Sequence, residues 1–216
     1  SVSPRTGWLP QHLVYRDSSE KLIGAVPLYL KGHSYGEYVF DWGWADAFEK
    51  AGQKYFPKLL SAVPFTPVTC PKLLVHPGED QSEVRSILAS GLVSALQQLN
   101  VSSLHINFSS LGEWEFLGKA KFLKRQGIQY HWNNNGYSSF DDFLNSLTSR
   151  KRKAIRKERK AANESGVNIR FLTGAQIEKR HWDAFFKFYV DTSDRKWGSA
   201  YLNREFFTLL GERMAD

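Results

Sequence analysis

The segment between residues 31 and 44 concentrates side chains that can exchange protons. It reads Lys-Gly-His-Ser-Tyr-Gly-Glu-Tyr over residues 31–38 and continues to an aspartate and two tryptophans. Glycines on either side of the His-Ser-Tyr triplet suit a tight loop that presents these side chains to a ligand. Imidazole, phenol and carboxyl groups can act as general acids or bases, and four residues are therefore catalytic candidates: His33, Tyr35, Glu37 and Asp41. The alternative is a surface loop with a solvated histidine.

A second segment has the composition of a binding surface. Eight of the eleven residues from Arg150 to Lys160 are basic and only Glu158 is acidic, so the segment carries a net charge of +7, equal to that of the whole chain. At about 100° per helical residue, five of these cations share a sector of about 120°: Arg150, Lys153, Arg156, Lys157 and Lys160. This crowding predicts a helix that contacts phosphate on tRNA, on a nucleotide-linked donor or on a phospholipid headgroup. The alternative is a solvated helix face.

A third tract combines polar and aromatic residues near the end of the chain. Trp197 and Tyr201 are candidates for clamping a ligand, although packing explains them equally well. The single cysteine, Cys70, excludes an internal disulfide and a multi-cysteine metal site. Because the sequence also lacks the H-E-x-x-H, G-x-S-x-G and P-loop motifs, we expect no metal and no standard nucleophile elbow.

Composition and periodicity indicate a folded chain with mixed secondary structure. Hydrophobic residues make up 42% of the sequence, which is enough for a packed core, and no apolar run approaches the length of a membrane span. Capping residues such as Asp80, Ser139 and Asn203 predict several helix starts. Strands are expected over residues 11–16, 21–31, 72–76, 103–108, 127–132 and 167–172. Helices are expected over residues 45–61, 80–100, 110–118, 139–147, 149–164, 174–192 and 204–214.

The order of these elements predicts an α/β (mixed α+β) fold in two parts. Residues 1–135 alternate strands and helices and form the first unit. The Asn-Asn-Asn-Gly turn at 133–136 is the strongest turn signal in the chain and is the expected boundary. Residues 136–216 are richer in helix and charge and form a second unit, which begins with the basic helix.

Five tracts resemble the FemAB-like predicted N-acyltransferases, also called peptidoglycan biosynthesis/recognition proteins. They occur in the family's order and read PLYLKGHSYGEYVFDWGWADAF (27–48), PFTPVT (64–69), QYHW (129–132), SRKRKAIRKERK (149–160) and RKWGSAYLNREFF (195–207). The resemblance implies two GNAT-like α/β units, the second of them incomplete, because the chain matches the middle of a longer family sequence.

The resemblance also implies a reaction. It suggests transfer of an acyl or aminoacyl group to an amine, with acyl-CoA or aminoacyl-tRNA as the donor. Amide formation requires a deprotonated amine and a stabilised tetrahedral oxyanion, and the four catalytic candidates could serve these needs without an assignment of roles. The basic helix would then hold an anionic small molecule or tRNA through charge-assisted contacts.

Two alternatives remain open at this stage. A non-catalytic RNA- or phosphate-binding module would explain the basic helix without any reaction, and peripheral contact with a membrane would explain it through lipid headgroups. We expect a cytoplasmic protein. Because the chain begins with Ser1, however, an upstream targeting peptide that directs the protein to an organelle is the alternative.

Overall fold

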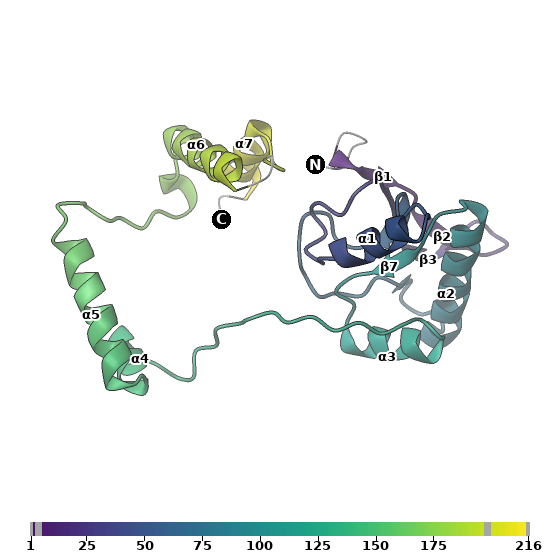
Figure 1. Ribbon diagram of the computed structural model, residues 1–216, viewed down its shortest axis with the longest axis horizontal. Helices are drawn as coiled ribbons and strands as arrows, with labels where there is room; N and C mark the ends of the chain where they lie inside the picture. The colour runs from purple at the N-terminus through teal and green to yellow at the C-terminus, as the bar shows by residue number, and fades with distance from the viewer. Residues whose placement is uncertain (1, 3–5, 197–199, 215–216) are drawn as a thin grey trace. The chain divides into compact units, whose positions relative to one another are not determined.

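The computed structural model describes residues 2, 6–196 and 200–214, which form two compact units. The first unit comprises residues 1–127 and 193–203, and the second comprises residues 128–192 and 204–216. Strands are confined to the first of these units among the described residues, whereas both contain helices (Figure 1). The predicted mixed α/β class is confirmed.

A four-stranded sheet organises the first unit. Its strands lie in the order β1 (Trp8–Pro10), β4 (Tyr29–Lys31), β5 (Lys58–Ser61) and β7 (Leu104–Ile106). Only the β5–β7 pair is parallel. Because side chains alternate along a strand, this register places two lysines, one from β4 and one from β5, opposite each other on one face. The other face carries leucines and an isoleucine that join the main hydrophobic core.

That core is shared with a second sheet and two helices. The second sheet has the order β2 (Leu13–Arg16), β3 (Leu22–Val26) and β6 (Leu74–Val75). Helix α2 (Gln81–Gln98) packs along β2 and β3 (Figure 1), and α3 (Leu111–Lys119) contributes its buried Leu117 to the core. Burial of these leucines and valines removes apolar surface from water, which is the main force that holds the unit together.

Local hydrogen bonds fix where these elements begin. The Asp80 carboxylate accepts from the backbone N–H groups of Ser82 and Glu83 and caps α2, as the sequence predicted. On α3 the buried Glu113 carboxylate accepts from the backbone N–H groups of Lys72 and Leu73 at 2.6–2.9 Å. Glu113 therefore ties the segment before β6 to α3.

The second unit consists of helices. They are α4 (Phe140–Ser146), α5 (Ser149–Asn163), the 3-10 turn η2 (Gly174–Gln176), α6 (Lys179–Arg195), whose last residues belong to the first unit, and α7 (Arg204–Arg213). Between α6 and α7, the Arg204 guanidinium donates to the Asp183 carboxylate at 2.8 Å, and rings of α6 surround the buried Phe207. Ser139 caps α4 as predicted, through a capping box with Asp142. Thr173 forms a capping box with Gln176 at η2, and the helix expected over residues 174–192 begins only at Lys179, as α6.

Three sequence-based element predictions were wrong, and a fourth, the strand over residues 21–31, was right only in part. Residues 58–61, expected as the end of a helix, form the buried strand β5, and the helix before them, α1 (Trp42–Lys50), ends at Lys50. The structure describes residues 127–132 and 167–172 and forms no strand over either range. Almost all of their side chains are exposed, so strand-like residue types alone did not create a pairing partner. Residues 21–31 form two strands, β3 and β4, separated at Pro27.

Candidate functional site

The two opposed lysines on the polar face of the four-stranded sheet form the centre of a buried ionic cluster. Both Lys31 and Lys58 are fully buried. The Lys58 ammonium donates to Ser34 Oγ and Glu37 Oε2, each at 2.9 Å, and to Asp41 Oδ2. All three of its hydrogens are therefore used. Burying an ammonium group is tolerated only with such partners, so this loop and this sheet face depend on each other.

Two further side chains extend the cluster. The buried Tyr55 hydroxyl donates to Asp41 Oδ2 at 2.7 Å and lies 3.3 Å from His105 Nε2. Ser103 Oγ lies 2.8 Å from the same imidazole nitrogen. His105 and Ser103 belong to β7 and the segment just before it, next to β5, so the four-stranded sheet itself positions these groups. We call Ser34, Glu37, Asp41, Tyr55, Lys58 and His105 the lysine cluster.

Burial and neighbouring charges change the acidity of these groups in different directions. Burial raises the pKa of Glu37, although the Lys58 ammonium opposes it. Burial also acts to raise the pKa of Asp41, but hydrogen bonds from Lys58, Ser34 and Tyr55 outweigh it and leave that pKa lowered. Burial and the Lys58 charge lower the pKa of His105 to about 4, so its imidazole is neutral near pH 7. Asp41 is the ionised partner of Lys58.

Lys31 is the second buried lysine on this face of the sheet. Its ammonium donates to the backbone oxygen of Tyr35 at 3.1 Å and lies 4.1 Å from the centre of the Trp8 ring. Burial lowers the pKa of Lys31 to about 8, with Glu37 opposing and Lys58 reinforcing that shift. The folded protein therefore releases this proton well before an ordinary lysine would.

We expect the free energy of unfolding to rise between about pH 8 and pH 10 because of Lys31. In this window the unfolded chain, with an ordinary lysine pKa of about 10.5, binds more protons than the folded protein. The gain is at most about 3 kcal/mol over the full interval. Urea unfolding of the wild type and of Lys31→Met across this range measures it. Equal pH dependence in the two proteins would show that Lys31 stays protonated.

Four polar atoms around this region are buried and have no hydrogen-bond partner among the described residues. Two are carboxylate oxygens, Glu37 Oε1 and Asp41 Oδ1, and two are donors, Asn107 Nδ2 and Trp8 Nε1. The register places Trp8 opposite Lys31, and Asn107 follows His105 by two residues. Buried polar groups are normally paired, so these atoms are available to water or to a ligand group.

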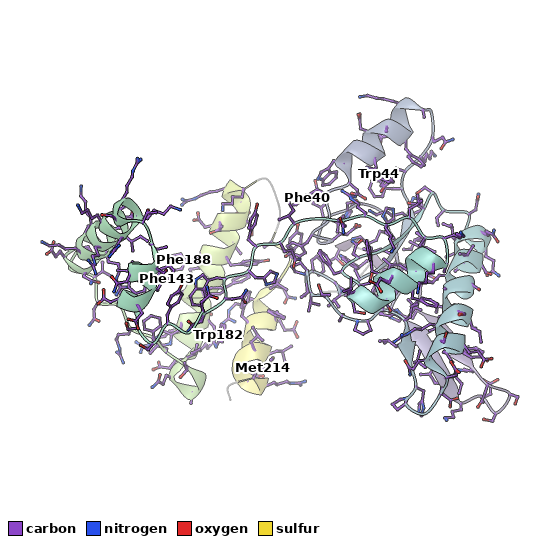
Figure 2. The ribbon with its side chains drawn as sticks, turned by 90° about the horizontal axis from the view of Figure 1, so that it is seen from below. Phe40, Trp44, Phe143, Trp182, Phe188 and Met214 are labelled. Carbon is purple, nitrogen blue, oxygen red and sulfur yellow. The ribbon has the colours of Figure 1, made fainter. Side chains whose placement is uncertain are left out.

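The loop that carries the acidic residues presents aromatic side chains on its other side. Five of them between residues 35 and 44 are exposed: Tyr35, Tyr38, Phe40, Trp42 and Trp44. The rings of Tyr35 and Trp42 meet edge to face with centres 5.5 Å apart. Figure 2 shows Phe40 and Trp44 at the surface of the first unit, where the Arg125 guanidinium donates to the Phe40 backbone oxygen at 2.8 Å.

Two glycines allow this loop to fold tightly. Gly7 has a positive φ of 68°, and a Cβ there would lie 2.3 Å from the His33 imidazole. Gly36 has a φ of 78°, and a Cβ there would lie 2.6 Å from the Phe65 ring. Both positions combine a conformation that side chains rarely adopt with a close approach that they would block.

The basic helix α5 is well formed and has no buried residue. Arg156 pairs with Asp141 at 3.3 Å, Lys160 pairs with Glu164 at 3.7 Å, and Arg152 donates to two neutral oxygens near α4. Five other cations of α5 have no acidic partner among the described residues: Arg150, Lys151, Lys153, Lys157 and Arg159. We call Arg150, Lys153 and Lys157, which share one face of the helix by helical phase, the outer row.

A comparison with known protein families matches the chain to the FemAB-like family, described as peptidoglycan biosynthesis/recognition. The match extends over residues 1–216. The chain belongs to the FemAB-like family. The resemblance carried by the five sequence tracts is thus confirmed, and the family suggests a peptidoglycan-related function of the aminoacyl-transferase type. No curated protein matches the chain.

In this FemAB-like chain the four catalytic candidates come from one loop but occupy different environments. Glu37 and Asp41 point inward to Lys58 and are buried, whereas Tyr35 is half exposed. His33 Nδ1 accepts from the backbone N–H of Tyr35 at 3.2 Å, and burial together with the Lys31 charge lowers the His33 pKa. His33 is therefore neutral near pH 7 and helps to orient Tyr35.

The remaining candidates, two aromatic residues and five cations, lie outside the loop that carries the catalytic candidates. Tyr201 lies in the first unit with its ring centre 5.0 Å from that of Phe65, next to the PFTPVT tract. Trp197 lies outside the described residues. The five cations predicted to bind an anion are all on α5. Among the described residues no group of three or more histidine, cysteine, aspartate or glutamate side chains could hold a metal ion, and no helix is long and apolar enough to cross a membrane.

Sequence reasoning missed Lys58, Tyr55 and His105. Lys58 was assigned to a helix, where a lysine is ordinarily exposed, although it begins a run of buried residues in β5. Lys58 itself could have indicated the site. If residues 58–61 had been predicted as a buried strand, the buried Lys58 ammonium would have required acidic partners. Glu37 and Asp41 were already candidates, but nothing in the sequence linked them to a position about 20 residues away.

Proposed function

We propose that this chain is part of an N-acyltransferase that passes an acyl or aminoacyl group to an amine. The observation that carries the proposal is the FemAB-like family match over residues 1–216. The donor is acyl-CoA or aminoacyl-tRNA, and both carry phosphate groups. Both are made in the cytoplasm, which is where we expect the chain to act.

In this proposal α5 holds the phosphate-bearing substrate. The outer row is exposed and has no acidic partner among the described residues, so its positive charge is not neutralised within the protein. Adjacent like charges on a helix repel one another, and a bound phosphate removes that repulsion. We keep the predicted set Arg150, Lys153, Arg156, Lys157 and Lys160 as our candidate anion site, because a phosphate can replace the exposed carboxylate partners of Arg156 and Lys160.

The four loop candidates divide into two roles. The Tyr35 hydroxyl makes no hydrogen bond to the described residues and is accessible, so it is the group that can donate to the oxyanion of a tetrahedral intermediate. Glu37 and Asp41 hold the loop on Lys58, and His33 orients the Tyr35 backbone. We therefore propose Tyr35 as the substrate-contacting residue and the other three as positioning residues.

Donor binding should raise the thermal stability of the protein. A ligand present at 100 times its Kd stabilises the folded state by about 2.7 kcal/mol. Thermal unfolding is measured with acyl-CoA and free CoA, and with aminoacyl-tRNA and deacylated tRNA. If one acylated donor shifts the transition more than its deacylated form does, that donor is identified. If neither donor shifts the transition at high concentration, the transferase proposal fails.

The outer row also favours a second candidate, a non-catalytic module that binds RNA or phosphate. Contacts between lysine or arginine and phosphates position a protein on RNA without reading its sequence. Such a module would bind aminoacylated and deacylated tRNA equally and would transfer no acyl group. The comparison of acylated with deacylated donors therefore separates the two functions.

A further inference from the structure

A hollow between α4 and α5 brings cations and apolar side chains together. Its volume is about 480 Å³, within the range of sites that hold small molecules. It lies entirely within the second unit, and Figure 1 shows α4 beside α5. Eight residues line it: Phe140, Asp141, Leu144, Arg156, Arg159, Lys160, Asn163 and Glu164.

Three cations of α5 line this hollow, and only two of them form ion pairs with acidic residues beside them. Arg156 and Lys160 form exposed pairs with Asp141 and Glu164, at 3.3 Å and 3.7 Å. Exposed pairs of this kind contribute little, so a phosphate can replace the carboxylates. The two carboxylates also line the hollow and reduce its positive charge, which leaves an excess of one.

Arg159 supplies that excess and is held in place by an aromatic ring. Its guanidinium lies 4.2 Å from the centre of the Phe140 ring, and it has no carboxylate partner among the described residues. A guanidinium stacked on an aromatic face keeps its planar fork available for an oxyanion. Two guanidinium groups and an ammonium group therefore border one hollow, with the Asn163 side chain as a further lining group.

The apolar part of the hollow distinguishes it from the outer row. Leu144 is buried and Phe140 is partly exposed, so the wall next to the cations is hydrophobic. By helical phase, Arg156, Arg159 and Asn163 lie within about 100° of Ile155, while Lys153, Lys157 and Arg150 lie about 160–220° away. The helix thus has two cationic surfaces, and only the inner one adjoins hydrophobic side chains.

We propose that the hollow between α4 and α5 binds a phosphate group that is attached directly to an aromatic or apolar group. Arg156, Arg159 and Lys160 contact the phosphate, and Phe140 and Leu144 contact the attached group. The inference rests on the proposed anion-binding role of α5 and deepens it: the inner surface selects one phosphate with its hydrophobic neighbour, and the outer row attracts a longer polyanion.

The test compares phenyl phosphate with inorganic phosphate by calorimetric titration of the full chain. We expect phenyl phosphate to bind about tenfold more tightly, because its ring covers apolar surface. Arg159→Gln should weaken both ligands by about tenfold or more. Phe140→Ala should remove the preference for phenyl phosphate. Lys187→Gln, a matched charge change at an exposed position of α6 in the same unit, should alter either affinity by less than about threefold.

The outcomes separate this inference from the proposed function. Equal affinity for the two phosphates, or equal effects of Arg159→Gln and Lys187→Gln, overturns the hollow as a selective site. If tRNA binding still requires the outer row in that case, the proposed function stands without it. Naphthyl phosphate and hexyl phosphate, titrated in the same way, show whether the preferred attached group is an aromatic ring or an alkyl chain. Circular dichroism of each variant shows whether its helices are retained.

Discussion

Replacement of Lys58 by methionine should lower the free energy of unfolding by about 3–5 kcal/mol. The change keeps most of the side-chain volume but removes the ammonium group that pairs with Glu37 and Asp41, both of which are buried. Two buried carboxylates would then face each other without a cation, and at least one would take up a proton. Urea unfolding at neutral pH, monitored by tryptophan fluorescence, measures the loss.

Two further variants make this prediction specific. Lys54→Met removes an exposed lysine four residues earlier and should change stability by less than about 0.5 kcal/mol. Adding Glu37→Gln and Asp41→Asn to Lys58→Met should restore part of the loss, because the buried charges are gone. A Lys58→Met protein as stable as the wild type would mean that the ionic cluster does not hold loop 32–41.

Replacement of five α5 cations by glutamine should reduce tRNA affinity by at least about 10³-fold at low salt. The variant changes Arg150, Lys153, Arg156, Lys157 and Lys160. Its melting temperature should stay close to that of the wild type, because the two lost ion pairs are exposed and relief of like-charge repulsion offsets them. Fluorescence anisotropy with labelled tRNA gives the affinities, and calorimetry gives the melting temperatures.

A matched variant separates this surface from overall charge. It carries glutamine at five exposed cations outside α5: Lys54, Lys119, Lys121, Lys187 and Arg213. Both variants lower the net charge by five. Equal loss of tRNA affinity in the two would show that binding depends on net charge rather than on α5. Unfolding of the α5 variant would show that its cations have a structural role.

The elements that the sequence predicted best are those set by neighbouring residues. The α2 and α4 starts follow from Asp80 and Ser139, which cap helices within three residues of themselves. Strand β5 could not be recognised in the same way, because it is a strand only by pairing with β4 and β7, which are distant in sequence. Residues 167–172 show the reverse case: strand-like residues remain exposed and unpaired.

In the candidate site, too, the sequence predicted what neighbouring residues determine and missed what depends on contacts between residues distant in sequence. The loop from His33 to Asp41 was predicted from its local density of reactive side chains and its glycines. Its organisation was not, because the Lys58 contact to Asp41 spans 17 residues and the Tyr55 contact to His105 spans 50. The charge of α5 could be read from the sequence, whereas the hollow beside Arg159 required the position of α4.

The salt dependence of tRNA binding by the wild-type chain tests the central claim most directly. If α5 contacts six or more phosphates, the affinity should fall by about 10³-fold between about 50 and 200 mM salt. A linear plot of the logarithm of Kd against the logarithm of salt concentration with that slope, and a much shallower slope for the five-glutamine variant, is the predicted result. A flat response in the wild type, or the same slope in both proteins, would contradict the assignment of α5 as the phosphate-binding helix.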